Sequence, residues 1–492
     1  MGSFEEIQAV RIEKRARLEQ KQVSVYPAAL SGKRTRIKDA LAVFDKLAHN
    51  GSKIIIAGRI RAVREHGGSL FLDIDDGTAM QQIYVKKDEI GADSFALFGQ
   101  TVDVGDFIES SGTLFYTKKK EKTLQAASWH MLAKSMRPLP EKWHGLKDVE
   151  ERYRRRYLDL LMNEEVRERF VLRSRIISAL RSFLKKEEFL EVETPMLQTI
   201  AGGALARPFV THHNALDRDL YLRIAPELYL KQLLVGGMER VYELGKSFRN
   251  EGIDTEHNPE FTSVEWYAAY WDEEAMMTCV ERCVAALLKA LGTDACTWNG
   301  QRITFPKRYR RVTFTDLLRR YALINDYEGE TRESLRLRAR QFGIEAGAAA
   351  PKGKIADEIY KKICRPHVTE PTFVIHHPVD ISPLAKRRDE NPKEVRRFQL
   401  VVAGIEVANG FSELNDPAEQ RARFQEQQRI REGGEEEAHR YDEEFIEALE
   451  YGMPPAAGVG IGVDRLVMLF SGAQNIREVI LFPTMRPRSG NS

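Results

Sequence analysis

The sequence predicts an α+β protein in two parts, a small β-barrel followed by a larger domain built from strands and helices. Three observations support this fold class. Between residues 54 and 134, short alternating segments are separated by glycines and charges, as in a small barrel. An apolar residue then recurs every fourth position from Leu172 to Leu184, which predicts an amphipathic helix. From Val241 to Tyr270, two extended segments flank a polar turn, which predicts a long-looped hairpin.

Length and composition limit the class of protein. A chain of 492 residues exceeds one ordinary core, and 42% hydrophobic with 30% charged residues is typical of a globular protein with much polar surface. The formal net charge is only +2, so any nucleic-acid surface must be a local patch. No apolar run is long enough to span a membrane, and the N-terminus is charged where a secretory leader would be apolar. We therefore expect a cytoplasmic protein.

Four cysteines in a chain of this length do not indicate a disulfide scaffold. Cys279 and Cys283 lie four apart in a helical stretch without nearby ligand partners, so we expect small core residues. The pair His376-His377 likewise has no spaced partner ligand, which argues against a metal site there.

The first 50 residues form an N-terminal extension in which residues 4–22 are rich in charge and in helix formers. This composition predicts an exposed helix, which serves either as a basic arm that touches RNA or as a solvated surface. Residues 51–136 then form the barrel.

Two barrel strands place unusual side chains outward. In the segment 69–75 the apolar residues alternate toward the interior, which leaves Phe71 outside. The same alternation in the segment 80–86 leaves Gln82 and Tyr84 outside. Exposed aromatics beside an amide suit stacking on unpaired bases and reading of their edges, although a single outward Phe is often incidental.

A proline-punctuated linker is predicted at 137–160, and the second domain at 161–492. In its hairpin, period-two alternation places Arg249 and Glu251 on one face of the first segment. The second segment places Ser263, Glu265 and Tyr267 on one face and Val264 and Trp266 on the other. An arginine, carboxylates and a tyrosine on one surface form a candidate site for a charged ligand, and a solvated face is the alternative.

The segment 397–413 also alternates as a strand. Period two places Asn409, Phe411 and Glu413 on one side, which resembles a pocket for an aliphatic chain that ends in a cation. A strand with two exposed polar groups is the alternative.

Glycines alternate with apolar residues at Gly458, Gly460 and Gly462, which leaves one strand face bare enough for a flat ring to lie against the backbone. Asp464 then stands where it can cap the following helix, with Arg465 at the helix start. The GxGxG spacing fails the dinucleotide GxGxxG pattern, and Gly245-Lys246-Ser247 lacks the earlier glycine of a P-loop.

Residues 248–261, FRNEGIDTEHNPEF, resemble the second signature motif of class II aminoacyl-tRNA synthetases of the lysine, aspartate and asparagine subgroup. Phe189–Pro195 resembles the first motif, and Gly458–Phe470 resembles the third. The match extends along nearly the whole chain, and its details are similar to those of the lysyl-tRNA synthetases of bacterial type.

The resemblance implies an OB-fold anticodon-binding domain, followed by a class II catalytic domain in which helices flank an antiparallel β-sheet. The catalytic domain would contain a mainly helical insertion at about 275–366, with little site chemistry. Phe71 and Gln82 would read the central anticodon base, and Arg59 would contact phosphate. The first motif implies a homodimer, although its helix would equally fit internal packing.

By the same resemblance, the activity would be ATP-dependent conversion of L-lysine to lysyl-adenylate, followed by transfer to the 3′ end of tRNA(Lys). Arg249 and Arg465 would be the catalytic residues. The implied ATP-binding residues are Arg249, Glu251, His257, Asn258, Phe261, Glu406, Gly462 and Arg465. The implied lysine-binding residues are Gly203, Glu227, Arg249, Glu265, Tyr267, Asn409, Phe411 and Glu413.

Two positions depart from the family pattern. Relatives commonly hold Mg²⁺ with two glutamates, whereas this chain has Glu406 and Gln399. An amide oxygen ligates magnesium more weakly than a carboxylate does, so Gln399 is an uncertain ligand. Glu256 stands where relatives often carry a basic or neutral residue, and the sequence alone gives it no role unless it points to solvent.

Three alternatives remain at this point. A lysyl-transferring paralogue would act on an acceptor other than tRNA, but such proteins typically lack the barrel or carry membrane spans. An aspartate- or asparagine-specific synthetase would need a cation or amide donors where this chain has Glu413. A regulatory RNA-binding protein that has lost catalysis would not be expected to keep Arg249, Glu251 and Arg465.

Overall fold

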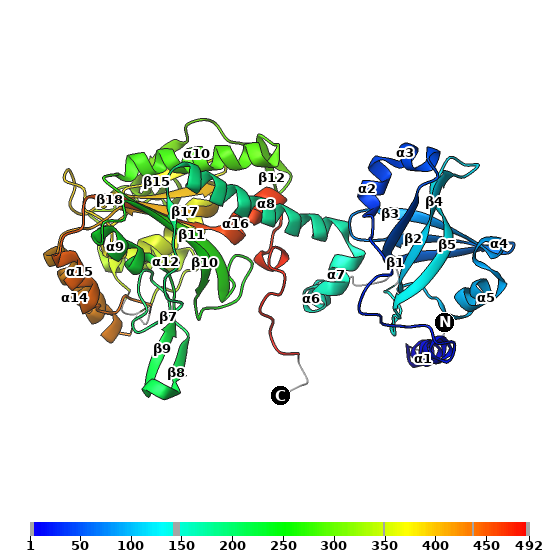
Figure 1. Cartoon of the computed structure of the whole chain (residues 1–492). Coiled ribbons are helices and arrows are strands. Elements are labelled where there is room, and N and C mark those ends of the chain that lie inside the picture. Colours follow the sequence, from blue (N-terminus) through cyan, green and yellow to red (C-terminus); the bar gives the residue numbers. More distant parts are fainter. Residues whose placement is uncertain (1–3, 141–147, 348–349, 435–436, 489–492) are drawn as a thin grey trace. The chain divides into compact units, whose positions relative to one another are not determined.

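The computed structural model describes residues 4–140, 148–347, 350–434 and 437–488. These residues form two compact units, Met1–Gly145 and Leu146–Ser492 (Figure 1). Residues 141–147 of the predicted linker lie outside the described residues.

The first unit is a closed five-stranded barrel with strand order β1-β2-β3-β5-β4. Its strands are β1 (Lys53–His66), β2 (Ser69–Asp75), β3 (Met80–Lys86), β4 (Phe107–Tyr116) and β5 (Lys122–Ala133). Its helices are α1 (Phe4–Gln20), α2 (Ile37–Ala42), α3 (Phe44–His49), α4 (Lys87–Ile90) and α5 (Ala92–Thr101). The predicted barrel is confirmed, whereas α4 and α5 between β3 and β4 were not expected from the sequence.

The barrel interior follows the predicted alternation. Leu70, Leu72 and Ile74 of β2 are buried, and Phe71 is only half-buried on the outer side. Along β3, Gln82 and Tyr84 alternate outward with buried apolar neighbours. Period two therefore sets which side chains face the core.

Helix α1 is tied to the barrel rather than solvated along its length. The buried guanidinium of Arg11 donates to the carbonyl oxygens of Ser135 at 2.9 Å and Val104 at 3.0 Å. Lys14 forms an ion pair with Asp103 at 2.5 Å. Helix α1 is therefore mostly exposed, as expected, but Arg11 and Leu18 are buried and polar contacts hold one face of the helix.

The second unit contains an eight-stranded sheet of order β14-β15-β16-β17-β18-β11-β10-β6. Strand pairs are antiparallel except at the two edges, where β14 and β15, and β10 and β6, run parallel. The sheet strands are β6 (Leu190–Glu191), β10 (Arg240–Phe248), β11 (Glu260–Ala269), β14 (Arg310–Thr313), β15 (Thr372–Ile375), β16 (Arg397–Val402), β17 (Ile405–Ser412) and β18 (Ala456–Gly462).

The remaining elements surround this sheet. Two small sheets are formed by β7 (Leu197–Gln198), β8 (Val210–His213) and β9 (Arg218–Leu222), and by β12 (Ala295–Trp298) and β13 (Gln301–Thr304). The helices are α6 (Val149–Arg154), α7 (Arg156–Met162), α8 (Glu164–Lys186), α9 (Glu227–Val235), α10 (Glu273–Leu291), α11 (Phe314–Ala322), α12 (Arg332–Gln341), α13 (Lys352–Ile359), α14 (Pro417–Glu432), α15 (Glu443–Glu450) and α16 (Val463–Ser471). Short 3₁₀ or π turns occur at Asn214–Leu216, Tyr360–Cys364, Arg365–His367, Val379–Ile381 and Ile476–Glu478.

One face of the large sheet is apolar and packs against helices. Val264 and Trp266 of β11 are fully buried there, in one cluster with residues of α8, α10 and α16. Cys279 and Cys283 of α10 belong to the same cluster, which confirms that they are small core residues. Figure 1 shows α8 and α10 running along this side of the sheet. The opposite face of β11 is free to carry polar side chains.

The predicted hairpin is confirmed as the antiparallel pair β10 and β11, but its first face is corrected. Strand β10 ends at Phe248, so Arg249 and Glu251 lie in the connecting loop. The Arg249 amide donates to the Pro259 carbonyl at 2.8 Å, and the Glu251 amide donates to the Arg249 carbonyl at 2.8 Å. The first bond extends the β10–β11 pairing by one residue pair and the second is a local turn bond, so regular strand alternation does not reach Glu251.

Asp464 does not cap α16, because the helix begins at Val463 with Gly462 as its N-cap. The Asp464 carboxylate accepts from the Thr262 amide at 2.6 Å and forms an ion pair with Arg173 of α8. Its negative charge in the first helical turn is still favourable for the helix dipole. The side chain thus joins α16, β11 and α8.

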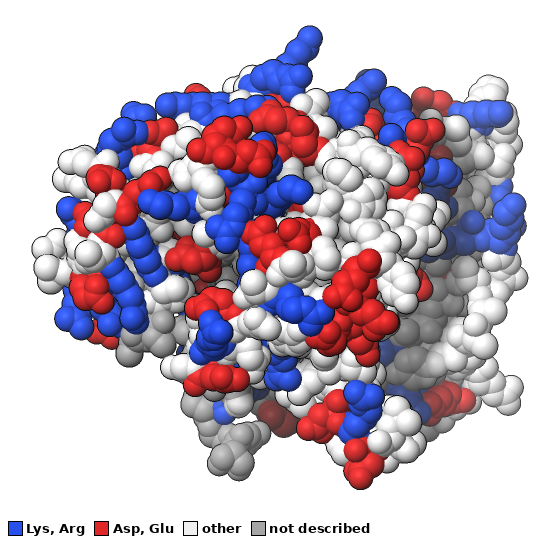
Figure 2. Space-filling model, turned by 90° about the vertical axis from the view of Figure 1, so that its left-hand side faces the viewer, with Lys and Arg blue, Asp and Glu red and all other residues white. Residues whose placement is uncertain are grey.

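Charges of both signs share the surface that carries α14 and α15. Figure 2 shows lysine, arginine, aspartate and glutamate side chains interspersed over this side of the second unit. Arg421 of α14, for example, pairs with Glu443 and Glu450 of α15, each at 2.9 Å. Among the described residues, no helix combines the length and the apolar character needed to cross a membrane.

Candidate active site

Two rows of side chains cross the polar face of the sheet. Strand register aligns Glu265 of β11 with Gly460 of β18, and Gly460 with Asn409 of β17. The neighbouring row aligns Tyr267 with Gly458, and Gly458 with Phe411. The structure therefore brings together residues that the sequence placed on three separate strands.

Gly458 and Gly460 face the protein's own side chains. A Cβ atom at Gly458 would collide with the Tyr267 ring and the Glu413 carboxylate, and one at Gly460 would lie 3.4 Å from Glu265. The expectation that this strand face is bare for a flat ring is therefore wrong at these two glycines. At Gly462 the nearest side chain is Arg465, 3.7 Å away, so this end remains compatible with a ring.

Three glutamates beside these rows form what we call the acidic pocket: Glu227 at the start of α9 and Glu413 just beyond β17 are buried, and Glu265 in β11 is half-buried. The Tyr267 hydroxyl donates to Glu265 at 3.1 Å. Burial, with the charge of nearby Glu227, raises the pKa of Glu265 to about 8, and burial raises the pKa of Glu413. A largely buried group of carboxylates is suited to bind a cation.

A lysine of the protein lies inside this pocket and was not anticipated from the sequence. The ammonium of Lys231 in α9 is 2.5 Å from the carboxylate of Glu227 and 2.6 Å from that of Glu413. It also lies 5.2 Å from the centre of the Phe411 ring. The helical spacing of Glu227 and Lys231 could have indicated their pairing, but nothing local indicated Glu413.

Gly203 and Asn409 lie at the edges of the pocket. Gly203 has a φ of +87°, and a Cβ there would lie 2.9 Å from the Cβ of Glu227, so only glycine fits. Asn409 accepts a hydrogen bond from Arg397 of β16 at 3.0 Å. Arg397 also donates to the hydroxyl of Ser382 at 2.9 Å, so it fixes the orientation of the Asn409 amide.

Arg249 lies in the loop after β10, near the charges of Glu251 and Glu265. Its guanidinium is 5.0 Å from the centre of the Phe261 ring. Its Nε atom is buried without a hydrogen-bond partner, and burial lowers the pKa of this arginine. A buried guanidinium with an unused donor is well suited to bind an anion.

The loop between β10 and β11 meets the start of α16. His257 pairs with Asp254 at 2.8 Å, and its other ring nitrogen is 3.1 Å from a guanidinium nitrogen of Arg465. Arg465 also donates to the backbone carbonyl of Glu406 at 3.3 Å. Asn258 donates to the Glu260 carbonyl at 2.6 Å, while its side-chain oxygen is buried without a partner. These groups surround the open end of the sheet at Gly462.

Gln399 and Glu406 are neighbours, as the resemblance implied for a metal pair. The Gln399 amide nitrogen donates to Glu406 at 3.2 Å, which leaves the buried amide oxygen without a partner. An unused amide oxygen beside a carboxylate fits Mg²⁺, which prefers oxygen ligands. Within the described ranges, no cluster of three or more His, Cys, Asp or Glu side chains could hold a metal alone.

Glu256 has a partner within the protein. Arg365, at the end of the predicted helical insertion, lies 3.3 Å from Glu256 and 4.0 Å from Glu406. The insertion therefore contributes to the site, contrary to expectation, and it also contains the strands β12, β13 and β14. The ion pair with Arg365 explains how the protein accommodates an acidic side chain at position 256.

The barrel carries a separate candidate surface on β2 and β3. The Phe71 and Tyr84 rings pair across the strands at 4.8 Å between centres. Gln82 accepts a hydrogen bond from Thr123 at 2.9 Å. The basic residue opposite Phe71 is Arg64, whereas Arg59 lies further along β1 opposite Asp75.

Arg59 is engaged within the barrel. Its guanidinium lies 4.2 Å from the centre of the Phe107 ring and donates to the Gly105 carbonyl at 2.9 Å. Burial lowers the pKa of this arginine. The structure therefore brings Phe71 close to Gln82 and Tyr84 but does not bring Arg59 beside them.

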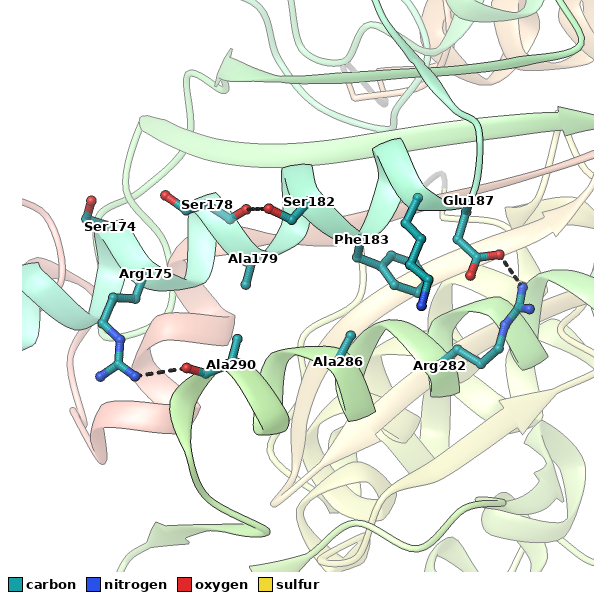
Figure 3. A pocket seen from close by; sticks show the side chains of 11 residues that line it. Ser174, Arg175, Ser178, Ala179, Ser182, Phe183, Glu187, Arg282, Ala286 and Ala290 are labelled. Carbon is teal, nitrogen blue, oxygen red and sulfur yellow. Dashed lines mark hydrogen bonds and ion pairs between the residues drawn. The ribbon is translucent and has the colours of Figure 1, made fainter.

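A groove of about 630 Å³ lies between α8 and α10, on the helical side of the sheet (Figure 3). Its lining is mostly small, with Ala179, Ala286 and Ala290 facing one another. Arg282 pairs with Glu187 at 2.8 Å, and Arg175 donates to the Ala290 carbonyl at 2.9 Å. We assign the groove no part in the site, because it lies across the sheet from Glu265 and these arginines already have partners.

Family comparisons agree with this arrangement. Residues 148–486 match the model of the class II tRNA synthetases for aspartate, lysine and asparagine. Residues 54–132 match the model of an OB-fold nucleic acid binding domain.

Similar proteins cover the full chain. A lysine–tRNA ligase of Moorella thermoacetica is 49% identical over 98% of both chains. One of Syntrophomonas wolfei is 48% identical over 100% of this chain and 99% of its own length. One of Methanoculleus marisnigri is 47% identical, covering 97% of this chain and 94% of its own.

Proposed function

Because the chain belongs to the class II tRNA synthetases for aspartate, lysine and asparagine, with an OB-fold nucleic acid binding domain, we infer that it is a lysine–tRNA ligase. It activates L-lysine with ATP to give lysyl-adenylate and transfers the lysyl group to the 3′ end of tRNA(Lys). The observation that carries this inference is the acidic pocket of Glu227, Glu265 and Glu413, with Arg249 close enough to Glu265 to interact with its charge.

Selectivity for lysine follows from the charge of the pocket. Glu413 and Glu265, with the Tyr267 hydroxyl, receive the ε-ammonium, while Phe411 packs on the aliphatic stem. An aspartate side chain would need a free cation, but Lys231 already contacts two carboxylates. A substrate without the distal cation leaves buried carboxylates unpaired, which is more costly than losing a methylene contact.

The other end of lysine meets the nucleotide. Glu227 accepts the α-ammonium, with Gly203 and Asn409 beside it, and Arg249 bridges the lysine carboxylate and the α-phosphate. Phe261 and Arg465 lie on the two faces of the adenine, at the Gly462 end of β18. Glu251, His257 and Asn258 contact the remaining nucleotide groups. These residues occupy the positions of the family's motifs. The buried Nε donor of Arg249 and the buried side-chain oxygen of Asn258 have no partner in the protein, which supports their contact with a ligand.

The two chemical steps need no protein nucleophile. A lysine carboxylate oxygen attacks the α-phosphorus and pyrophosphate leaves; a terminal ribose hydroxyl of the tRNA then attacks the acyl carbon and AMP leaves. Arg249 and Arg465 lower the barrier by aligning the reactants and stabilising charge on the phosphates. Glu406 and the free oxygen of Gln399 would hold Mg²⁺, which neutralises phosphate charge when bound.

We propose a division of labour between the units. Residues 51–136 bind the anticodon through Phe71 and Gln82, with Arg59 as a more distant contact, and residues 161–492 carry the chemistry. Residues 1–50 brace the barrel, residues 137–160 link the domains, and residues 275–366 form the insertion. Ribosomes use the aminoacyl-tRNA that this reaction would produce, so we propose that the protein is cytoplasmic.

We also propose a homodimer formed through the first motif. The two-residue strand β6 is the edge of the large sheet, and its Leu190 is exposed. Met196, Leu197 and Val210 nearby in the small sheet region are exposed as well. Exposed apolar groups at a sheet edge favour burial against a second copy.

Pyrophosphate exchange with each amino acid, followed by charging of tRNA, tests the proposed function. Lysine should support strong exchange, and tRNA(Lys) should be charged. Strong exchange with aspartate or asparagine would overturn the specificity. Exchange with lysine but without charging of any tRNA would instead favour a lysyl transferase with another acceptor.

A further inference from the structure

The ammonium of Lys231 is buried in the lysine pocket, although the established chemistry of the family reaction requires no protein lysine there. Its side chain is fully buried and lies 2.5 Å from Glu227 and 2.6 Å from Glu413. These two glutamates come from α9 and from the segment after β17, which adjoin β11 in the fold (Figure 1). One ammonium therefore connects the two carboxylates proposed for the two ends of the substrate.

We propose that Lys231 is a resident counter-cation that matches the charge of the pocket to the two ammonium groups of lysine. It acts as a specificity-determining positioning residue rather than a catalytic one. The proposal rests on the proposed function, because it assigns Glu227 to the α-ammonium and Glu413 to the ε-ammonium.

The charge balance supports this role. The carboxylates of buried Glu227 and Glu413 and half-buried Glu265, with one buried ammonium, leave two negative charges when all are ionised, and bound lysine brings two ammonium groups. The substrate carboxylate faces Arg249 on the other side and does not enter this balance. Without Lys231, one buried carboxylate would remain unpaired or would take up a proton.

Other groups around Lys231 do not replace it. The ring centre of Phe411 of β17 lies 5.2 Å from the ammonium, and Glu265 of β11, which accepts from the Tyr267 hydroxyl, lies close enough to Glu413 that burial, together with this charge, raises the pKa of that carboxyl. Nearby His439 has its pKa lowered to about 4, by burial and by Lys231, so it is neutral. Arg397 is bound to Asn409 and Ser382, and Arg223 to Glu243. Both arginines are thus held by other partners.

The geometry also fixes the two carboxylates in space. One carboxylate oxygen of Glu413 accepts from the Lys231 ammonium at 2.6 Å, and the other has no hydrogen-bond partner, so it keeps capacity for a substrate ammonium. Glu227 likewise offers one oxygen to Lys231 and keeps the other. Lys231 thus holds both acids in place without using up their acceptors.

The test measures lysine binding by calorimetry from pH 7 to pH 9 in buffers of different ionisation enthalpy. Lys231→Met should weaken lysine binding at least about tenfold at neutral pH, since a buried charge loses its partner. Lysine binding to this variant should also release more protons per lysine than binding to the wild type. The pH at which lysine affinity rises should be higher in the variant. Lys231→Arg should keep the wild-type proton release even if its affinity falls.

Lys134→Met provides a matched control. Lys134 is also buried and pairs with two carboxylates, Asp103 at 2.5 Å and Asp106 at 2.8 Å, but it belongs to the barrel. It should lower thermal stability and leave lysine affinity and proton release unchanged. A purely structural role for Lys231 would produce the same pattern in Lys231→Met and would overturn the proposal.

A charge-compensated variant keeps the test decisive if Lys231→Met fails to fold. Lys231→Met combined with Glu265→Gln restores two net negative charges, so it should fold and return proton release toward the wild-type value. Lysine binding by Lys231→Met as tight as wild type, or tighter, would mean that Lys231 competes with substrate, and it would refute the proposal. Absence of lysine binding by the wild-type protein would instead refute the proposed function.

Discussion

Glu227, Glu265 and Glu413 lie together in the acidic pocket, the first and last of them buried, and carboxylates shielded from water stay charged only when cations neutralise them. The pocket is therefore partly protonated until a cationic ligand arrives. This property distinguishes it from a solvated acidic surface, whose groups would keep their ordinary pKa. Both predictions at the residue scale follow from it.

Glu413→Gln should raise the KM for lysine by about 100-fold, because the variant loses a buried charge pair worth roughly 3 kcal/mol. The KM for ATP should change little, since Glu413 lies in the lysine pocket. Pyrophosphate exchange at varied lysine and ATP measures both constants. Glu450→Gln on exposed α15 is the matched control, and an equal effect of both substitutions would contradict the assignment.

Lysine affinity should rise with pH. The pKa of Glu265 is about 8 in the empty pocket against an ordinary 4.5, so the carboxyl gains its charge only as pH passes 8. Its raised pKa also stabilises the ligand-free fold below pH 4.5, and this contribution is lost as pH rises through about 8. The increase in melting temperature caused by one fixed lysine concentration should therefore grow from about pH 6.5 to 8.5. The ε-ammonium of lysine stays charged over this range, because its pKa is about 10.4. A flat profile would be inconsistent with a protonated pocket.

At the scale of elements, the glycines of β18 leave room for side chains from the neighbouring strands. Gly458 is covered by Tyr267 and Glu413, so its lack of a side chain shapes the lysine pocket. The strand order places β18 between β11 and β17, which carry those two groups or lead into them. Close strand packing, rather than backbone conformation, explains this glycine.

Gly458→Ala should raise the KM for lysine at least about tenfold, because the added methyl group displaces the Tyr267 ring or the Glu413 carboxylate. The KM for ATP should change less. Gly99→Ala in α5 is the control, since nothing lies within 4 Å of its added Cβ. Unchanged lysine kinetics in Gly458→Ala would show that the pocket tolerates the methyl group and does not depend on this packing.

At the scale of the whole molecule, anticodon binding and chemistry belong to different compact units, Met1–Gly145 and Leu146–Ser492. Phe71 lies in the first, with its ring tilted against that of Tyr84, while every residue proposed to contact lysine lies in the second. Activation of lysine should therefore be separable from recognition of tRNA.

Phe71→Ala should reduce kcat/KM for tRNA charging by about 10- to 100-fold, because base stacking on an aromatic contributes roughly 1–3 kcal/mol. Pyrophosphate exchange without tRNA should stay at the wild-type rate. The same preparation serves both assays, so exchange is its own folding control. Parallel loss of both activities would contradict the separation of the units.

The sequence by itself determined the two-part α+β fold, the barrel alternation and the polar face of β11. These features depend on local periodicity, since a strand sends alternate side chains to opposite faces. The motif in residues 248–261 also indicated the family. Strand alternation was wrong for Arg249 and Glu251, because β10 ends at Phe248 and both residues lie in the loop that follows.

Only the tertiary structure decided which charges meet. Lys231 reaches Glu413 across about half of the second unit's sequence, and Arg365 reaches Glu256 from the end of the insertion. Gly458 is required by side chains from two other segments. No local pattern encodes such pairs, because a buried charge finds its partner through strand register and packing, which join residues far apart in the chain.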